Sequence, residues 1–185
     1  MRAKLAALAA GTLVVGIPLA VVAIDAAWPW RPSADRGVAA RVAAAPDLDA
    51  YLTAREDSVP GVTPALRKAI HWHDPATRAR TPVAVVYLHG FSASRGELAP
   101  VPERLADSLG ANLFVTRLAA HGRVDGEAFA TVRPQDWIDD AREALAIGHR
   151  IGNRVIVLGM STGALLALEL AAESPDSLRP AALLL

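Results

Sequence analysis

Residues 155–168, with the sequence VIVLGMSTGALLAL, place one serine between two glycines directly after an apolar run. Gly159, Ser161 and Gly163 form the pattern G-x-S-x-G, in which a strand turns sharply into a helix. A Cβ atom at either glycine would collide across such a turn, and the serine is held in a strained conformation with its Oγ above the sheet. The pattern therefore predicts that Ser161 is a nucleophile, with Gly159 and Gly163 forming the elbow around it.

The alternative for this stretch is an ordinary glycine-rich turn in which Ser161 only caps the next helix. An apolar strand before the turn and a helix after it are the context that the nucleophile requires, and residues 154–159 and 162–174 have those patterns. The helix also directs its positive amino end at the hydroxyl, which favours a developing negative charge there. The context favours the nucleophile over the cap.

A second stretch, YLHGFSAS at residues 87–94, ends an earlier strand and supplies the other half of a possible site. A serine that attacks a carbonyl needs two backbone N–H groups for the oxyanion, and loss of one such donor typically costs about 3–4 kcal/mol. One donor is expected at Thr162, directly after the nucleophile, and the other at Phe91. The alternative for His89-Gly90 is a turn with a structural histidine, and His89 is not expected to be the catalytic base.

The elements that would position this site follow a regular order from residue 82 onward. β-branched or apolar runs predict buried parallel strands, and amphipathic stretches between them predict helices. The predicted strands are residues 82–90, 111–118, 154–159 and 180–185, and the predicted helices are residues 97–110, 133–152 and 162–174. Strands that alternate with helices pair in parallel through right-handed crossovers, so the fold class is α/β with an open, mostly parallel sheet. Upstream, residues 47–57 predict a helix capped by Asp47, and residues 67–73 predict a strand.

Composition excludes several function classes. Lys and Arg together number 19, as do Asp and Glu, so the formal net charge is zero and no nucleic acid is expected as a partner. The chain has no cysteine, which excludes disulfides and thiolate metal sites.

Two other polar clusters have weaker claims to chemistry. The run His71-Trp72-His73-Asp74 invites a metal site, but it departs from H-x-H-x-D-H, the pattern of binuclear metal hydrolases. It is therefore interpreted as a strand end with surface histidines. Asp139 and Asp140 are adjacent on a predicted helix and do not face each other, so they are expected on a solvated face with Arg142. Neither a metal nor any other cofactor is predicted.

The first 30 residues differ from the rest of the chain. Residues 5–24 carry no charge and would span about 30 Å as a helix, which is the thickness of a bilayer core. With Trp28 and Trp30 placed to lie at the far interface, this segment is interpreted as an uncleaved membrane anchor with the domain outside the cytoplasm. A cleaved signal peptide, which would give a secreted protein, is the alternative. Residues 31–46 are interpreted as a linker and residues 47–185 as the domain.

The stretches VVYLHGFSAS, LFVTRLAAHGR and RVIVLGMSTGA, at these intervals, resemble the α/β-hydrolase superfamily. They are most similar to its serine-hydrolase branch of carboxylesterases, monoacylglycerol lipases and serine aminopeptidase-like proteins. The resemblance covers residues 47–185 and implies an esterase or lipase with Ser161 as nucleophile and Phe91 and Thr162 as oxyanion donors. It implies a carboxylic ester as substrate, lipid or acyl-glycerol-like.

The triad that this resemblance implies is incomplete. In this fold the order along the chain is Ser, then Asp or Glu, then His. All five histidines precede Ser161, and the only acids after it lie on or just after the elbow helix. The catalytic acid and base are therefore expected to be absent, the chain is interpreted as a carboxy-terminally truncated hydrolase, and this form is expected to be inactive or nearly so. The alternative is a non-catalytic, anchored binding or scaffold module of the same fold.

Overall fold

The computed structural model describes residues 31–185, of which residues 34–185 form one compact unit. Helices and strands alternate through most of it, as the sequence predicts. The α-helices are α3 (Val38–Ala44), α4 (Leu48–Asp57), α5 (Val101–Leu109), α6 (Pro134–Ile151) and α7 (Thr162–Glu173). The strands are β1 (Ala69–His71), β2 (Thr81–Leu88), β3 (Asn112–Val115), β4 (Gly152–Gly159) and β5 (Ala182–Leu184). Short 3₁₀ helices are η2 (Pro64–Leu66), η3 (Gly126–Ala130) and η4 (Asp176–Leu178).

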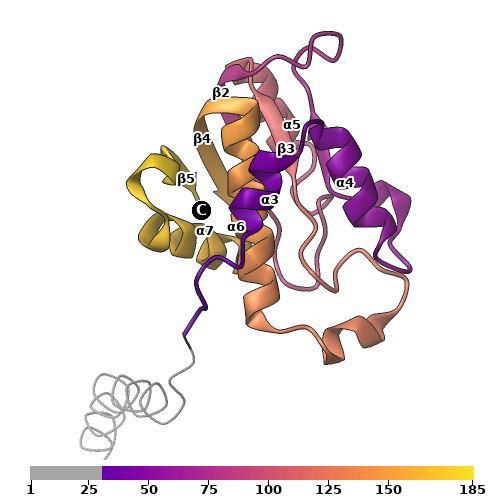
Figure 1. Cartoon of the computed structure of the whole chain (residues 1–185). Helices are drawn as coiled ribbons and strands as arrows, with labels where there is room; N and C mark the ends of the chain where they lie inside the picture. Colours follow the sequence, from indigo (N-terminus) through magenta and orange to yellow (C-terminus); the bar gives the residue numbers. More distant parts are fainter. Residues whose placement is uncertain (1–30) are drawn as a thin grey trace, which may run out of the picture. The chain divides into compact units, whose positions relative to one another are not determined.

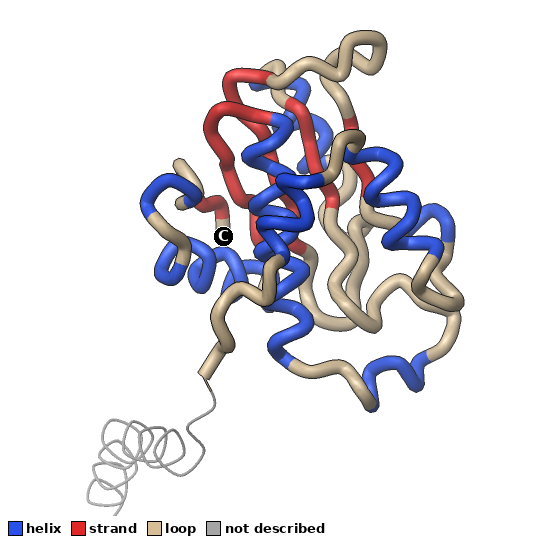
Figure 2. Tube along the Cα trace, viewed as in Figure 1, coloured by secondary structure: helices blue, strands red, loops and turns tan. Residues whose placement is uncertain are grey.

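The strands of the described region form a five-stranded sheet in the order β1-β3-β2-β4-β5. All neighbours pair in parallel except β1, which runs antiparallel to β3 at the edge. Figure 2 shows the strands side by side with helices packed around them. The prediction of an α/β fold with a mostly parallel sheet is confirmed. Since β2 and β4 are central and paired in register from Thr81↔Gly152 to Leu88↔Gly159, their carboxyl ends meet at one edge.

Two apolar clusters lie on opposite faces of the sheet, because successive side chains of a strand point to opposite sides. On one face Ala84, Val86 and Leu88 of β2 pack with residues of α3, α4, α6 and α7. On the other face Val85 and Tyr87 pack with residues of α5 and β3. Burial of strand β2 on both sides explains its continuous apolar sequence.

The amino-terminal part of the described chain differs from the prediction. Residues 31–46 were expected to be a linker, but α3 forms within them and packs beside α6, as Figure 1 shows. Val38 and Val42 are four residues apart and therefore share one helix face, and both are buried there. Arg150 of α6 donates hydrogen bonds to the carbonyls of Val42 and Ala45 at the end of α3. A two-residue apolar stripe in an alanine-rich sequence was too short a signal to predict this helix.

The next helix follows the prediction closely. The Asp47 side chain caps α4 by accepting a hydrogen bond from the Ala50 N–H at 2.8 Å. The predicted membrane anchor, residues 5–24, lies outside the described residues. Within residues 31–185, no helix has the length and apolar character needed to cross a membrane.

Candidate active site

Ser161 lies at the sharp turn between β4 and α7, as the sequence predicts. Its backbone has φ 51° and ψ −110°, a conformation that non-glycine residues rarely adopt and that stores strain of about 1–3 kcal/mol. Its side chain accepts no capping hydrogen bond from α7, which contradicts the alternative of a helix-capping serine. The residue is exposed, and among the described residues no side chain is hydrogen-bonded to its Oγ. The turn thus presents an unengaged hydroxyl at the amino end of a 12-residue helix.

The two glycines of the elbow are required by its tightness. A Cβ atom on Gly163 would lie 2.0 Å from the carbonyl oxygen of Leu88, and one on Gly159 would lie 2.6 Å from that of Gly163. The Met160 N–H donates to the same Leu88 oxygen at 3.0 Å, so the turn is attached directly to the end of β2. The elbow therefore closes only because both positions lack a side chain.

The loop after β2 holds its amide groups in a specific pattern. The Gly90 N–H donates to the Glu97 carboxylate at 2.8 Å, and the Ser92 N–H donates to Nε2 of His121 at 3.0 Å. The Phe91 N–H between them has no acceptor among the described residues, and neither has the Thr162 N–H at the start of α7. These two free donors are the ones that the sequence predicts for an oxyanion.

The two loops that carry these donors lie against each other. The hypothetical Cβ of Gly163 is 2.9 Å from the His89 carbonyl oxygen, and that of Gly90 is 3.4 Å from the Met160 carbonyl oxygen. Short contacts of this kind on both sides bring the Phe91 and Thr162 amides to the same edge of the sheet. The arrangement suits a pair of backbone donors fixed before any reaction.

Two buried histidines support this loop. His89 accepts a hydrogen bond from the Leu118 N–H through Nε2, and its Nδ1 lies 2.9 Å from the Gly90 carbonyl oxygen, to which it donates. Burial lowers the pKa of His89 to about 4. His121 likewise has Nδ1 against the Ala119 carbonyl, and burial lowers its pKa. Both nitrogens of each ring are engaged with backbone groups, so both histidines hold loops and neither is placed as a base for Ser161.

An aromatic group lies beside the free Phe91 amide. The Phe91 ring, which is 57% exposed, makes edge contacts with Phe129 and Trp137 at centroid distances of 5.5 and 5.8 Å. His121 contacts all three rings. Met160, next to Ser161, is also exposed. Two exposed apolar side chains, Phe91 and Met160, therefore lie on the loop after β2 and on the elbow.

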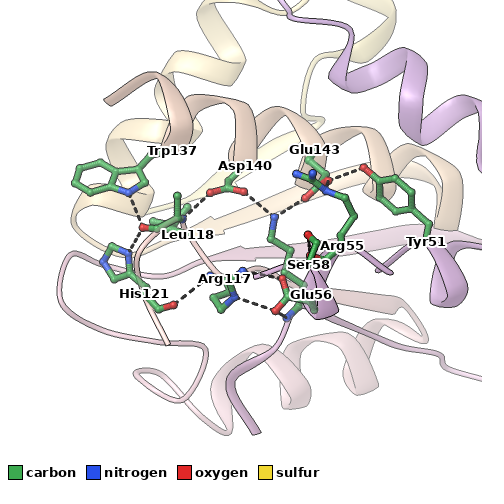
Figure 3. A network of polar contacts seen from close by, with 12 residues as sticks. Tyr51, Arg55, Glu56, Ser58, Arg117, Leu118, His121, Trp137, Asp140 and Glu143 are labelled. Atoms are coloured by element: carbon green, nitrogen blue, oxygen red, sulfur yellow. Dashed lines mark hydrogen bonds and ion pairs between the residues drawn. The ribbon is translucent and has the colours of Figure 1, made fainter. Parts of the chain in front are cut away.

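A buried ionic network lies between α4, the start of β1, α6 and the loop after β3, and Figure 3 shows it reaching His121 of that loop through Arg117. Lys68 Nζ contacts Asp140 at 2.7 Å and Glu143 at 2.5 Å, and burial of Lys68 would lower its pKa, but the two carboxylates raise it above its ordinary value. Arg117 binds Glu56 through two nitrogens at 2.9 Å. Each of these buried charged side chains is therefore paired with a side chain of opposite charge.

The expectation that Asp139 and Asp140 lie on a solvated helix face with Arg142 is wrong for both aspartates. The Asp140 side chain is only 12% exposed and accepts hydrogen bonds from Lys68 and from the Ala119 N–H. The Asp139 side chain is 15% exposed, accepts a hydrogen bond from the Gln135 side chain at 2.8 Å and lies 3.6 Å from Arg142. A lysine 72 residues away in sequence leaves no local signal, so the sequence could not predict that Asp140 is buried.

Two members of the metal candidate at His71, His73 and Asp74 have other partners. His71 Nε2 accepts from Arg95 at 2.6 Å, and the Asp74 carboxylate accepts from the Ala76 N–H and the Thr77 hydroxyl. Among residues 31–185, no group of three or more His, Asp or Glu side chains is arranged to hold a metal ion.

Sequence reasoning did not find one contact of the site, that of Glu97, whose carboxylate accepts hydrogen bonds from the Gly90 N–H and the Tyr87 hydroxyl. An acid nine residues after the end of β2 has no distinctive local pattern, so only the folded loop identifies this contact.

The comparisons with known proteins agree with this geometry. The sequence profile of the family described as serine aminopeptidase, S33, matches residues 79–185, which is more than half of the chain. A solved structure from work on LipS and LipT, two metagenome-derived lipolytic enzymes, is similar with a TM-score of 0.56 and 22% sequence identity. That match covers 66% of this chain and 45% of the other, so the chain spans less than half of the solved structure that it matches. No curated protein matches.

Proposed function

The chain belongs to the serine aminopeptidase S33 family of α/β-hydrolases, and from this membership we propose that it is a serine hydrolase of carboxylic esters with Ser161 as its nucleophile. One observation carries the proposal: Ser161 has φ 51° at the elbow, and two backbone N–H groups on the elbow and on the loop packed against it have no acceptor among the described residues. The donors are those of Phe91 and Thr162. Gly159 and Gly163 allow the turn that exposes the hydroxyl.

In the proposed reaction the Ser161 oxygen attacks the ester carbonyl carbon, and the carbonyl oxygen becomes an oxyanion. The Phe91 and Thr162 amides donate hydrogen bonds to that oxygen, and α7 directs its positive end at the same place. Collapse of the tetrahedral intermediate releases the alcohol and leaves an acyl group on Ser161, which water then removes. Each step needs a base to take and return the serine proton.

We propose that this base and its acid partner are absent from these 185 residues. All five histidines precede Ser161, and the two nearest the elbow loops, His89 and His121, are bound to backbone groups. A serine without its base is a poor nucleophile, although backbone donors and substrate binding alone retain about 10³–10⁴-fold acceleration over water in such enzymes. This residual acceleration does not need the serine, so acylation of Ser161 is expected to be slow and is identified by an acyl adduct and not by turnover.

The proposed substrate class is a small lipid ester, such as an acyl-glycerol. The exposed Phe91 ring and the neighbouring Phe129 and Trp137 rings offer an apolar surface beside the oxyanion donors. The similar solved structure is of a lipolytic enzyme by its description. We further propose that residues 5–24 anchor the domain on the extracytoplasmic side of a membrane, or that the domain is secreted if that segment is cleaved.

The test is hydrolysis of p-nitrophenyl butyrate by the full chain in detergent, together with intact-mass detection of an acyl adduct. We expect very slow turnover and an acyl adduct on Ser161, and we expect Ser161→Ala to lose the adduct. An adduct that Ser161→Ala still forms to the same extent would reject Ser161 as the nucleophile. Fast turnover that Ser161→Ala abolishes would show that a base is present among these residues.

A second candidate function is a non-catalytic binding module. The engagement of both nitrogens of His89 and of His121 favours it, because no described side chain activates Ser161. The module predicts no acyl adduct with any activated ester, although the chain binds apolar esters. Absence of the adduct in a folded chain would favour this candidate over the hydrolase.

A further inference from the structure

The orientation of the Phe91 N–H is set by the hydrogen bonds of the backbone groups on either side of it. Along the loop, the Gly90 N–H is bound by Glu97, the Gly90 carbonyl by His89, and the Ser92 N–H by His121. The Gly90 carbonyl belongs to the same peptide group as the Phe91 N–H, so these contacts fix the direction in which that N–H points. Of the three partners, His89 and Glu97 belong to the loop itself, whereas His121 comes from the loop after β3.

Glu97 is held in place from the sheet side. Its Oε2 accepts a hydrogen bond from the Tyr87 hydroxyl at 3.2 Å as well as the one from the Gly90 N–H at 2.8 Å. Tyr87 is fully buried in β2, and burial followed by the nearby Glu97 carboxylate raises its pKa above the ordinary value, so the hydroxyl remains a donor. The carboxylate thus links the rigid strand to the loop that follows it.

The carboxylate also lies against Gly90 with no spare room. A Cβ atom at Gly90 would be 2.9 Å from Glu97 Oε1 and 3.4 Å from the carbonyl oxygen of Met160. Glu97 and the nucleophile elbow therefore both lie close to the same side of Gly90. Loss of the Glu97 carboxylate would remove one of the contacts that hold this backbone segment in place beside the elbow.

We propose that Glu97 is a positioning residue that sets the Phe91 amide toward the carbonyl oxygen of a substrate on Ser161. It acts as a hydrogen-bond acceptor for the Gly90 N–H and not as an acid or a base. Its negative charge is a disadvantage near a developing oxyanion, because like charges repel. A neutral acceptor of the same shape should therefore serve at least as well.

This inference rests on the proposed function, and acylation of Ser161 tests both. The full chain in detergent is mixed with excess p-nitrophenyl butyrate, and the single-turnover rate of the Ser161 adduct is followed by intact mass. A misplaced catalytic group can lose about 10²-fold in rate, so we expect Glu97→Ala to slow acylation about 10- to 100-fold. We expect Glu97→Gln to stay within about 3-fold of wild type or to exceed it, because its amide oxygen still accepts from Gly90.

The matched control is Glu173→Ala, which removes an exposed glutamate at the end of α7 and should leave the rate unchanged. Glu97→Ala acylating as fast as this control would overturn the positioning role. Glu97→Gln as slow as Glu97→Ala would also overturn it, since the charge or a proton would then be what matters.

A second measurement decides the inference if wild type forms no adduct, which would count against the proposed function itself. Amide hydrogen exchange of Ser92 is measured by NMR in wild type and Glu97→Ala. Ser92 binds His121 and not Glu97, so its exchange reports on the loop as a whole. We expect at least about 10-fold faster exchange in Glu97→Ala with Glu97→Gln restoring protection. Unchanged exchange at Ser92 would overturn the role of Glu97.

Discussion

The nucleophile elbow and the buried ionic network differ in whether their polar groups have hydrogen-bond partners. At the elbow, Ser161 is strained and exposed, and the Phe91 and Thr162 amides have no acceptor among the described residues. In the network, Lys68 and Glu143 are almost fully buried, and each has partners at hydrogen-bond distance. One region leaves hydrogen-bonding capacity open, and the other uses it.

The difference separates groups kept for a ligand from groups kept for the fold. Open donors and backbone strain reduce stability, so they persist only where the surrounding structure enforces them, and such places are often functional. Substitution of a paired buried charge lowers stability, because it leaves an uncompensated charge in the interior. Substitutions in the network should therefore destabilise the protein, and a substitution that relieves the elbow should stabilise it.

The largest effect is expected from Lys68→Met, which removes the cation shared by Asp140 and Glu143. Asp140 then loses its lysine counter-charge while Glu143 keeps only the half-exposed Arg55 at 3.4 Å, and loss of one partner of a buried pair typically costs about 3–5 kcal/mol. Urea unfolding followed by circular dichroism measures the free energy of unfolding. The control is Arg78→Ala, which breaks an exposed pair with Asp49 and should cost less than about 1 kcal/mol. Equal losses in the two variants would contradict the distinction between the regions.

The network also shows what the sequence could not predict. The helix α6, the strands β2 and β4 and the elbow were predictable, because hydrophobic periodicity and the G-x-S-x-G pattern are local signals. Lys68 and Asp140 are 72 residues apart in the sequence, and Arg117 and Glu56 are 61 residues apart, so only the tertiary fold brings each pair into contact. Such partners depend on the tertiary packing of several elements, so the aspartates of α6 were predicted to be solvated.

The next effect is acid sensitivity at the loop that supports the elbow. Burial lowers the pKa of His89 to about 4, against 6.5 for an ordinary histidine, so the folded state resists its protonation. Because the unfolded state binds the proton first, stability falls as the pH drops from about 6.5 toward 4, by about 3 kcal/mol in all. Urea unfolding at pH 7, 6, 5 and 4 measures this loss.

The comparison variant for this prediction is His89→Gln, whose amide does not titrate and can accept from the Leu118 N–H. It should be less stable than wild type at pH 7 but should lose less stability between pH 7 and 4. A loss as steep as that of wild type would assign the acid sensitivity to other groups, such as His121, whose pKa burial also lowers.

A smaller loss is expected from Gly163→Ala in the elbow. The new Cβ would lie 2.0 Å from the Leu88 carbonyl oxygen, so β4 and the start of α7 must shift, at a cost of about 1–3 kcal/mol. Gly126→Ala is the matched control, because no atom lies within 4 Å of its Cβ position. Thermal unfolding should separate the two variants clearly. A Gly163→Ala variant as stable as Gly126→Ala would show that the elbow is looser than its contacts indicate.

The smallest effect has the opposite sign and comes from Ser161→Gly. Relief of the strain at φ 51° is worth about 1–3 kcal/mol, and the greater chain entropy of glycine in the unfolded state offsets about 0.5–1 kcal/mol of it. A net gain of about 1 kcal/mol raises the Tm by about 2–4 °C in a protein of this size. Ser161→Ala keeps the Cβ and the strained backbone, so its Tm should equal that of wild type although it also lacks the hydroxyl. If Ser161→Ala gained as much as Ser161→Gly, the hydroxyl and not the backbone would be the source of instability. The elbow would then differ from the network only in exposure and not in stored strain.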